Sequence, residues 1–246
     1  MLSYNIRYGG VGREKALAGV IAACEPELVI LQEATRPEVV RSLALACGFP
    51  VWSATLGDSV AFLSRAEVAS HQWHRVLLAR RRYLEIVLAD GRTRVYGVHL
   101  SAIHSNVTER RRTFEVHSLL QQTAGVRQQF HWFIGDFNTV AAGDPFDARN
   151  LPMRLRALLW VGGGPIRWTA HAAMLAAGYA DGYRQLHSDA GHTFPTWEPH
   201  VRLDYLFVPA QSRTSVTRCE VIRDAPGVRE ASDHFPLLAE IAIPPA

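Results

Sequence analysis

Polar side chains that could bind a cation or move a proton stand at the ends of apolar segments along this chain. Glu33 follows the apolar run Leu28–Leu31, and Asp136 follows Trp132–Ile134. A sheet whose strands end in acids presents carboxylates along one edge, where a site can form. Further polar residues lie at or beside the edges of other apolar runs: Asn5, His99, Asn138, Asp204, Asp233 and His234.

Most of these side chains offer hard oxygen atoms, the donors that Mg²⁺ and Mn²⁺ prefer over nitrogen and sulfur. Thiolates do not belong to the set, since Cys24, Cys47 and Cys219 are widely spaced and match no metal-binding pattern. Several carboxylates gathered with two histidines would repel one another unless a cation lay between them. The pattern therefore predicts a Mg²⁺ or Mn²⁺ site.

Each of these residues alone also has an ordinary structural explanation. Asp136 and Asn138 could form an Asx turn, because both residue types bond their own backbone. Glu33 could mark the point where a strand meets water. Asp204, close to Arg202, could form a surface salt bridge worth little stability. The functional interpretation depends on the whole set being brought together.

The elements that must position this set can be predicted from hydrophobic periodicity. We expect strands at Leu2–Ile6, Leu28–Leu31, Val60–Leu63, Leu84–Leu88, Arg94–Leu100, His131–Ile134, Tyr205–Val208 and Leu237–Ile243. We expect helices at 17–24, from about 39 to 48, at 109–122 and around 172–177. Thr35 and Glu38 have the spacing of a capping box, and Asp90-Gly91 predicts a hairpin turn.

Length and composition indicate one large folded unit. The chain has 246 residues, of which 48% are hydrophobic, so we expect a single domain over residues 1–246. The glycine-rich segment Gly162–Pro165 is expected to be a mobile loop rather than a boundary, because candidate site residues lie on both sides of it.

The charge and the amino terminus bear on partners and location. The formal net charge is only +3, which permits an anionic substrate without indicating a dedicated nucleic-acid binder. The chain shows no signal peptide and no apolar run of roughly 18 residues, the length that spans a membrane. We expect a cytoplasmic monomer, although Leu2–Ile6 already has a strand pattern, so a lost leader would be invisible.

Six segments resemble, in order, the motifs of the endonuclease/exonuclease/phosphatase superfamily, which includes deoxyribonuclease I and exonuclease III. They are Tyr4–Arg7 (YNIR), Leu31–Glu33 (LQE), Val98–Leu100 (VHL), Gly135–Asn138 (GDFN), Arg202–Tyr205 (RLDY) and Ser232–His234 (SDH). Any one of them could arise by chance, but six in the same order over nearly the whole chain are far more specific.

The resemblance implies a fold and a cofactor. The fold would be a four-layer α/β/β/α sandwich, in which two mixed β-sheets pack face to face with helices outside. The activity would be that of a metal-dependent phosphodiester hydrolase using in-line attack by water. Glu33 would be the principal ligand of Mg²⁺ or Mn²⁺, and Asn5 and Asp233 would complete or support that site. Whether one or two ions take part stays open.

The resemblance also implies catalytic roles. Asp136 would orient or deprotonate the attacking water, and Asn138 would hold the water or a phosphate oxygen. His234 would contact the scissile phosphate as a base or as an electrostatic stabiliser, with Asp204 fixing its tautomer. His99 would lie near the leaving group.

Several residues are weaker candidates. We hypothesise that Asp58 pairs with His99, although a solvated turn after Gly57 is the favoured explanation. One arginine of Arg80–Arg82 is expected to contact phosphate, whereas helical spacing places the members of Arg110–Arg112 on different sides of a helix. Trp197 could line the substrate pocket or pack in the core.

The sequence does not identify the substrate, because proteins of one fold act on many substrates. The insertion between Ala141 and Gly178 is expected to decide it. A nuclease should carry a basic stripe, and a sphingomyelinase should carry an apolar docking loop, for which Leu158–Val161 is the candidate. A general phosphodiesterase is preferred, with a DNA nuclease or a sphingomyelinase- or inositol-phosphate-type enzyme as alternatives. A non-catalytic binding module of the same fold is the competing class.

Overall fold

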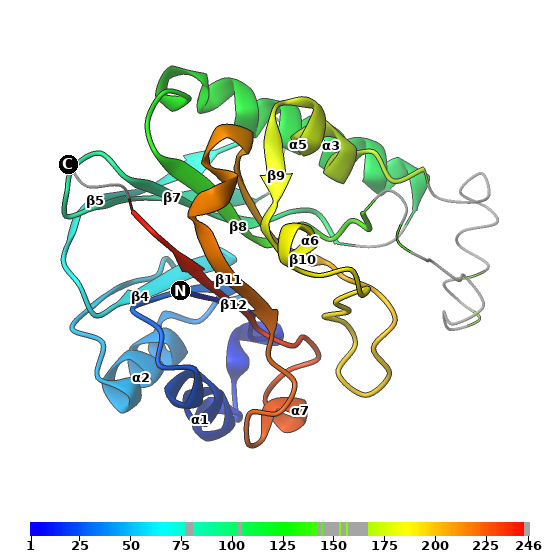
Figure 1. Cartoon of the computed structure of the whole chain (residues 1–246). Coiled ribbons are helices and arrows are strands. Elements are labelled where there is room, and N and C mark those ends of the chain that lie inside the picture. Colours follow the sequence, from blue (N-terminus) through cyan, green and yellow to red (C-terminus); the bar gives the residue numbers. More distant parts are fainter. Residues whose placement is uncertain are drawn as a thin grey trace.

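The computed structural model describes residues 1–76, 81–102, 105–141, 144, 153, 156 and 167–243. The strands form two sheets of six (Figure 1). The first sheet has the order β11 (Val216–Val221), β12 (Leu237–Ile241), β1 (Leu2–Asn5), β2 (Leu28–Gln32), β4 (Val60–Ser64) and β3 (Val51–Ser53). The second sheet has the order β5 (Val68–Arg75), β6 (Arg82–Leu88), β7 (Arg94–His99), β8 (His131–Asp136), β10 (Asp204–Pro209) and β9 (Tyr179–Asp181).

Both sheets are mixed. In the first, β1 is parallel to β2 and antiparallel to β12. In the second, β8 is parallel to β7 and antiparallel to β10. The inner faces of the two sheets share one apolar core, to which Ile30 and Phe62 contribute from one sheet and Ile86 and Trp132 from the other.

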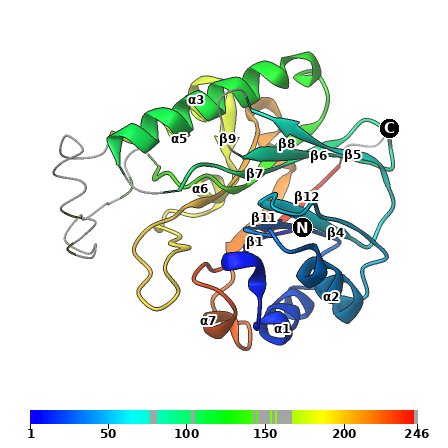
Figure 2. The ribbon, with the colours of Figure 1, turned by 180° about the vertical axis from the view of Figure 1, so that it is seen from behind.

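Helices cover the two outer faces, as Figures 1 and 2 show from opposite sides. On the first sheet lie α1 (Glu14–Cys24), α2 (Pro37–Cys47) and α7 (Val228–Ala231). On the second lie α3 (Asn106–Gln122) and α5 (Ala170–Ala176), and the short α6 (Gly182–Leu186) follows β9. The expected four-layer α/β/β/α sandwich is confirmed.

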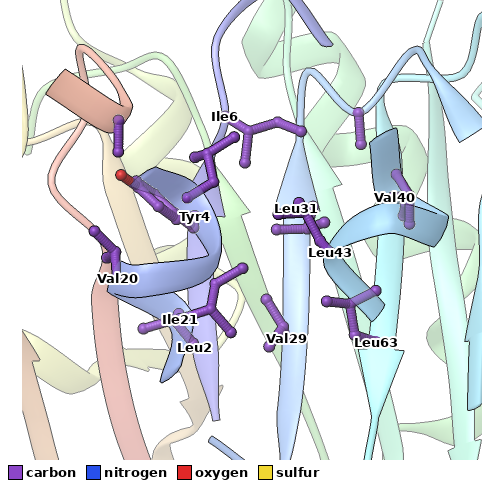
Figure 3. Packing of buried hydrophobic residues seen from close by; sticks show 14 of the residues in the cluster. Leu2, Tyr4, Ile6, Val20, Ile21, Val29, Leu31, Val40, Leu43 and Leu63 are labelled. Carbon is purple, nitrogen blue, oxygen red and sulfur yellow. The ribbon is translucent and has the colours of Figure 1, made fainter. Parts of the chain in front are cut away.

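Strand β2 shows why a strand that is buried on both faces has a continuous apolar run in the sequence. All of its residues are buried. Side chains alternate between the faces of a strand, so Val29 and Leu31 pack under α1 and α2 while Ile30 faces the second sheet. Figure 3 shows the outer packing, with Leu43 of α2 near Leu31.

The predicted capping box is wrong. The residue before α2 is Arg36 in an extended conformation, and no side chain caps the helix. Pro37 occupies the first helical turn, a position its fixed φ suits, and its ring disfavours helical geometry at Arg36. Thr35 therefore stands one residue too early to cap the helix.

The sequence pattern missed several short or exposed elements, namely β3, β5, β9, β11, α6 and α7. The edge strand β5 is mostly exposed and carries polar residues on both faces, so it lacks the alternation that marks a half-buried strand. The expected hinge Gly162–Pro165 and the candidate loop Leu158–Val161 lie outside the described residues. None of the described helices has the length and apolar character needed to cross a membrane.

Candidate active site

Three neighbouring strands of the second sheet place three of the predicted site residues in one row. His99 ends β7, Asp136 ends β8, and the two are direct neighbours in the parallel register. Asp204 begins β10 and pairs with Asp136 on the other side. Directly paired residues point to the same face of a sheet, so the three side chains lie next to one another.

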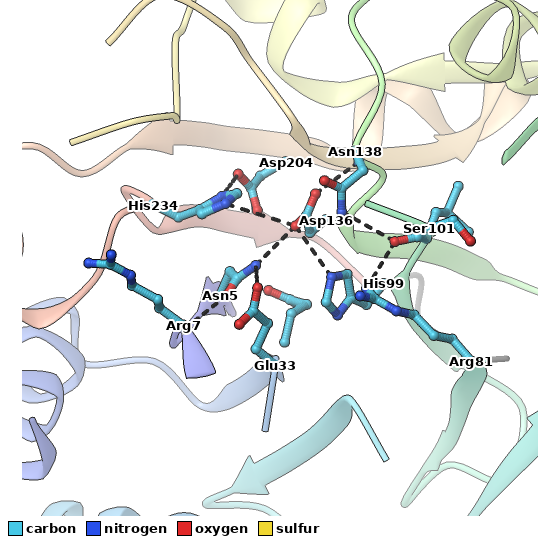
Figure 4. Close-up of polar contacts among 12 residues, drawn as sticks. Asn5, Arg7, Glu33, Arg81, His99, Ser101, Asp136, Asn138, Asp204 and His234 are labelled. Carbon is cyan, nitrogen blue, oxygen red and sulfur yellow. Dashed lines mark hydrogen bonds and ion pairs between the residues drawn. The ribbon is translucent and has the colours of Figure 1, made fainter. Parts of the chain in front are cut away.

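The first sheet brings Asn5 and Glu33 to the same place. Asn5 ends β1 and Glu33 follows β2, and because these strands are parallel their ends meet at one edge. Asn5 Nδ2 donates to Asp136 Oδ2 at 3.0 Å and to Glu33 Oε1 at 3.5 Å. The Asn5–Asp136 hydrogen bond joins the two sheets at the centre of the cluster in Figure 4.

The backbone around these side chains is held in an unusual conformation. The φ angles of Arg7, Tyr8, Glu33 and Asn138 are 49°, 48°, 55° and 51°. Non-glycine residues with such angles are uncommon, and they cluster at functional sites because the surrounding structure must hold them there. At Glu33 the conformation lets the carboxylate accept the backbone N–H of Tyr8 at 2.6 Å.

Asp136 is the hub of the site. Its Oδ1 accepts the backbone N–H of Asn138 at 2.9 Å, and its Oδ2 lies 3.7 Å from His99 Nε2 and 4.0 Å from His234 Nε2. The side chain is buried, and burial raises its pKa above the usual aspartate range. A buried carboxylate in contact with two imidazoles is suited to accept a proton.

His234 forms a pair with Asp204. Its Nδ1 lies 2.9 Å from Asp204 Oδ2, while Phe194 packs against the ring with centroids 4.8 Å apart. Burial acts to lower the pKa of His234, but the Asp204 carboxylate outweighs it, so the pKa is raised. The pairing also fixes the tautomer and leaves Nε2 facing Asp136.

His99 has the opposite character. It is buried, and neither ring nitrogen has a hydrogen-bond partner among the described residues. Burial lowers its pKa well below the usual value, and the nearby Arg81 charge acts in the same direction. The hypothesised Asp58–His99 pair is wrong, because the Asp58 carboxylate binds the Arg82 guanidinium at 2.6 Å instead.

Arg81 is the member of the predicted arginine cluster that reaches the site. Its Nη1 donates to the backbone oxygen of Leu100 at 2.9 Å, and Figure 4 shows it beside His99. The same Leu100 oxygen accepts from Asn138 Nδ2 at 3.2 Å. Arg82 forms its ion pair with Asp58, and Arg80 lies outside the described residues.

Asp233 lies on the opposite side of the cluster, next to Arg7. Arg7 Nε is 3.2 Å from Asp233 Oδ2, and Figure 4 shows Arg7 and Arg81 at opposite ends of the site. The loop that carries Asp233 is fixed by Ser232, whose hydroxyl donates to the backbone oxygen of Asn5 at 2.6 Å. Arg7 was not among the predicted site residues, although it lies within the YNIR segment.

The chemistry of the donors suits a hard divalent cation. Amide and carboxylate oxygens of this kind are offered by Asn5, Glu33 and Asp233. The Asn5 amide nitrogen, which carries partial positive charge, lies between the carboxylates of Glu33 and Asp136. Within the described part of the chain, a second group, Asp136, Asp204 and His234, has donor atoms that all lie within 4.8 Å of one another. Because His234 Nδ1 is already bonded to Asp204, we favour the first set for a metal and the second for proton chemistry.

The weaker candidate Trp197 and its neighbour in the sequence, Thr193, lie in different environments. Trp197 is 62% exposed, so the alternative that it packs in the core is excluded. Thr193 is buried, and its Oγ1 accepts the backbone N–H groups of Leu203 and Asp204 at 3.0 and 3.4 Å. Thr193 thus supports the start of β10 rather than facing a substrate.

Comparison with solved structures shows the same fold at low sequence identity. The 3′ phosphatase NExo from Neisseria, bound to a product DNA hairpin, aligns with a TM-score of 0.72 and 18% identity over 98% of both chains. An AP endonuclease from Archaeoglobus fulgidus gives 0.74 and 16%, again over 98% of both chains. A family protein from Leptotrichia buccalis gives 0.68 and 18%, with the same coverage.

No curated protein matches the sequence. The model of the Endonuclease/Exonuclease/phosphatase family, however, matches residues 2–234, which include every residue of the site described above. The chain belongs to the endonuclease/exonuclease/phosphatase family.

Proposed function

We propose that this chain is a metal-dependent phosphodiester hydrolase that uses Mg²⁺ or Mn²⁺. The observation that carries the proposal is the position of Asp136. Its carboxylate binds Asn5 of the first sheet and lies within 4.0 Å of His99 and His234. A buried acid surrounded in this way can activate water beside an anionic substrate.

Asn5, Glu33 and Asp233 would hold the metal ion. When bound, the ion supplies Lewis acidity at a non-bridging phosphate oxygen, an effect worth several kcal/mol. Glu33 is fixed for this task by the Tyr8 backbone N–H on one oxygen and by Asn5 on the other. Such fixed partners orient metal ligands and are costly to lose.

Asp136 and Asn138 would position the attacking water. The raised pKa of Asp136 makes its carboxylate a better proton acceptor than an ordinary surface aspartate. Asn138 is held by its own N–H to Asp136 and by its amide to Leu100, so its side chain is oriented before a substrate arrives.

His234 and Arg81 would stabilise negative charge on phosphorus. The raised pKa of His234 keeps it as an imidazolium at neutral pH, which favours an electrostatic role over that of a base. Arg81 brings a guanidinium to the other end of the cluster. His99, kept neutral by burial, can offer a hydrogen bond near the leaving group.

Hydrolysis of bis-p-nitrophenyl phosphate tests the proposal. The wild type should turn over with Mg²⁺ or Mn²⁺ and stop with EDTA, while Glu33→Ala and His234→Ala should each lose at least about 10²-fold in kcat/KM. Matched controls are Glu240→Ala and His117→Ala, which remove exposed residues of the same types. Equal, near-zero rates in all of these proteins would instead support the competing class, a binding module without catalysis.

The class of phosphodiester is a separate question. NExo is a 3′ phosphatase with a bound product DNA hairpin and the Archaeoglobus protein is an AP endonuclease, which supports nucleic acid as a candidate substrate. A sphingomyelinase- or inositol-phosphate-type activity remains the alternative. A panel of plasmid DNA, an abasic-site oligonucleotide, sphingomyelin and small phosphoesters, each assayed with added metal, separates these classes.

A further inference from the structure

Two exposed aromatic rings flank the guanidinium of Arg7 at the edge of the site. Tyr8 is 78% exposed and Trp197 is 62% exposed. The Arg7 Cζ atom lies 5.4 Å from the centroid of the Tyr8 ring and 5.9 Å from that of Trp197. Large aromatic side chains left in water are costly unless they have a partner to cover them.

This group, Arg7–Tyr8–Trp197, is tied directly to the proposed catalytic residues. Arg7 binds Asp233 at 3.2 Å, and the backbone N–H of Tyr8 is bonded to Glu33. Trp197 packs edge-on against Phe194 with centroids 6.3 Å apart, and Phe194 packs against the ring of His234. A molecule lying on these rings would therefore be held within a few ångströms of the groups proposed to act on phosphorus.

We propose that Arg7, Tyr8 and Trp197 form a stacking surface for the base of an unpaired nucleotide whose phosphate enters the active site. This inference rests on the proposed phosphodiesterase function and names its substrate class. Bases stack on aromatic rings and on guanidinium planes, and only an unpaired base offers its flat face for such contact. Stacking depends little on the identity of the base, because every base has a flat aromatic face.

The charge of the molecule favours a short or single-stranded substrate over a long duplex. A protein that follows a duplex backbone neutralises many phosphates with basic residues, and this chain has a formal net charge of only +3. Affinity gained from rings at the site would compensate for this low net charge. Arg7, with its Nε on Asp233, keeps its terminal nitrogens close to the same surface.

A lipid surface is the other class of partner that exposed aromatic rings could meet. Here the rings lie among charged groups, since Arg7 sits between them, Glu198 adjoins Trp197, and Arg229 donates to the backbone oxygen of Thr196. A membrane would have to desolvate these charges, whereas a nucleotide presents a phosphate to them. The nucleotide is therefore the better match.

Fluorescence anisotropy with two labelled single-stranded octamers tests whether these rings stack on bases. One is an octathymidylate, and the other carries an abasic tetrahydrofuran at every position, so the two have the same phosphates and differ only in their bases. Binding is measured in EDTA, where turnover is stopped and the missing metal affects both octamers equally. We expect the wild type to prefer the octathymidylate, and Trp197→Ala and Tyr8→Ala each to lose roughly 5- to 100-fold of that preference.

Controls separate stacking from damage to the fold. Trp197→Phe should recover most of the preference, and Phe114→Ala, which removes an exposed ring on α3, should change nothing. Equal affinity of the wild type for both octamers, or an unchanged preference in Trp197→Ala, would overturn the inference. So would binding of phosphatidylcholine–phosphatidylserine vesicles that depends on Trp197. Because this readout needs no turnover, it can fail while hydrolysis of bis-p-nitrophenyl phosphate succeeds, and the reverse.

Discussion

The two imidazoles beside Asp136 are held in opposite charge states by their surroundings. Burial acts on both rings, but only His234 has a carboxylate, Asp204, on its far nitrogen. The same buried hub therefore meets one cationic ring and one neutral ring. This difference is the reason why the proposed mechanism gives charge stabilisation to His234 and a neutral hydrogen bond to His99.

Replacing Asp204 with Asn isolates the effect of that carboxylate. Asn keeps the shape but removes the charge that raises the pKa of His234 and selects its tautomer. We expect kcat/KM for bis-p-nitrophenyl phosphate to fall roughly 10²-fold, and the fold to lose about 1–3 kcal/mol at pH 7, because the carboxylate that raises the pKa of His234 also stabilises the folded state. Steady-state kinetics and urea unfolding check the two parts separately. A variant that kept full activity would show that the pair is only structural.

Arg81 and Arg82 offer a matched pair of neighbours with different surroundings. Arg81 points to the site and Arg82 binds Asp58. Arg81→Ala should lower kcat/KM by roughly 10- to 100-fold, since a charge-assisted contact to phosphate is worth about 1.5–3 kcal/mol. Arg82→Ala should leave kcat/KM nearly unchanged. The reverse order of effects would mean that the arginine assignment is wrong.

At the scale of elements, the active-site row depends on how closely β7 and β8 approach. Gly135 precedes Asp136 and has a φ of 148°, and a Cβ at this position would lie 1.9 Å from the backbone oxygen of Val98. Val98 is its direct neighbour in the parallel pairing. The glycine of the GDFN motif thus lets the strand that carries Asp136 sit against the strand that carries His99.

Gly135→Ala should therefore destabilise the fold by about 3 kcal/mol or more, because a backbone atom cannot move aside as a side chain can. Gly19→Ala is the matched control. Gly19 is exposed in α1, with nothing within 4 Å of an added Cβ, and the substitution should stabilise by roughly 0.5–1 kcal/mol. Urea unfolding of both variants measures the two effects, and their opposite signs are the prediction.

A second element-scale feature is a buried ionic group that joins β9, α5 and β10. Asp181 accepts from Arg202 Nη1 at 2.9 Å, lies 3.1 Å from His171 Nε2, and caps α6 through the N–H groups of Tyr183 and Arg184. Burial alone would raise the pKa of Asp181, but His171 and Arg202 together outweigh it and hold the pKa well below the usual value.

The sign of the pH effect follows from that lowered pKa. A carboxylate whose pKa is lower in the folded state stabilises the fold above its unfolded pKa, about 3.9, and loses that contribution as the pH falls below it. Asp181→Asn should cost about 3 kcal/mol at pH 7, since breaking the buried pair leaves Arg202 with only its longer contact to Asp144, at 3.5 Å. Urea unfolding of both proteins at pH 7 and near pH 3 should show the difference shrinking in acid. A difference that grew in acid would contradict the assignment.

At the scale of the whole molecule, the sequence predicted the four-layer architecture and the buried strands but not the short or exposed elements. Buried strands such as β2 could be predicted from their apolar runs, and Asn5, His99 and Asp136 each stand at the end of such a strand. Periodicity could not reveal β5, whose exposed edge carries no alternation, or the Asp58–Arg82 pair, which depends on how the turn before β4 meets the start of β6. The order of the six motifs predicted the family. The hydrogen bond between Asn5 and Asp136 depends on how the two sheets pack, which the sequence pattern does not show.

The two sheets each supply carboxylates to one small region, so the cation-free protein must hold like charges together across the sandwich. Asn5 links Asp136 of the second sheet to Glu33 of the first, and Asp233 is balanced by Arg7. A cation bound only in the folded state stabilises that state by RT ln(1 + [L]/Kd). Mg²⁺ at about 100-fold above its Kd should then raise the melting temperature by roughly 5–10 °C.

Glu33→Ala should abolish this Mg²⁺ response while leaving the melting temperature in EDTA unchanged or slightly higher, because one of the crowded carboxylates is gone. Glu240→Ala, which removes an exposed carboxylate paired with Arg218, should keep the full response. Differential scanning calorimetry with and without Mg²⁺ measures all three proteins without any substrate. If Mg²⁺ raised the melting temperature of wild type and Glu33→Ala equally, the cation would bind away from the edge where β1 and β2 end. The proposed metal ligands Asn5, Glu33 and Asp233 would then be wrong.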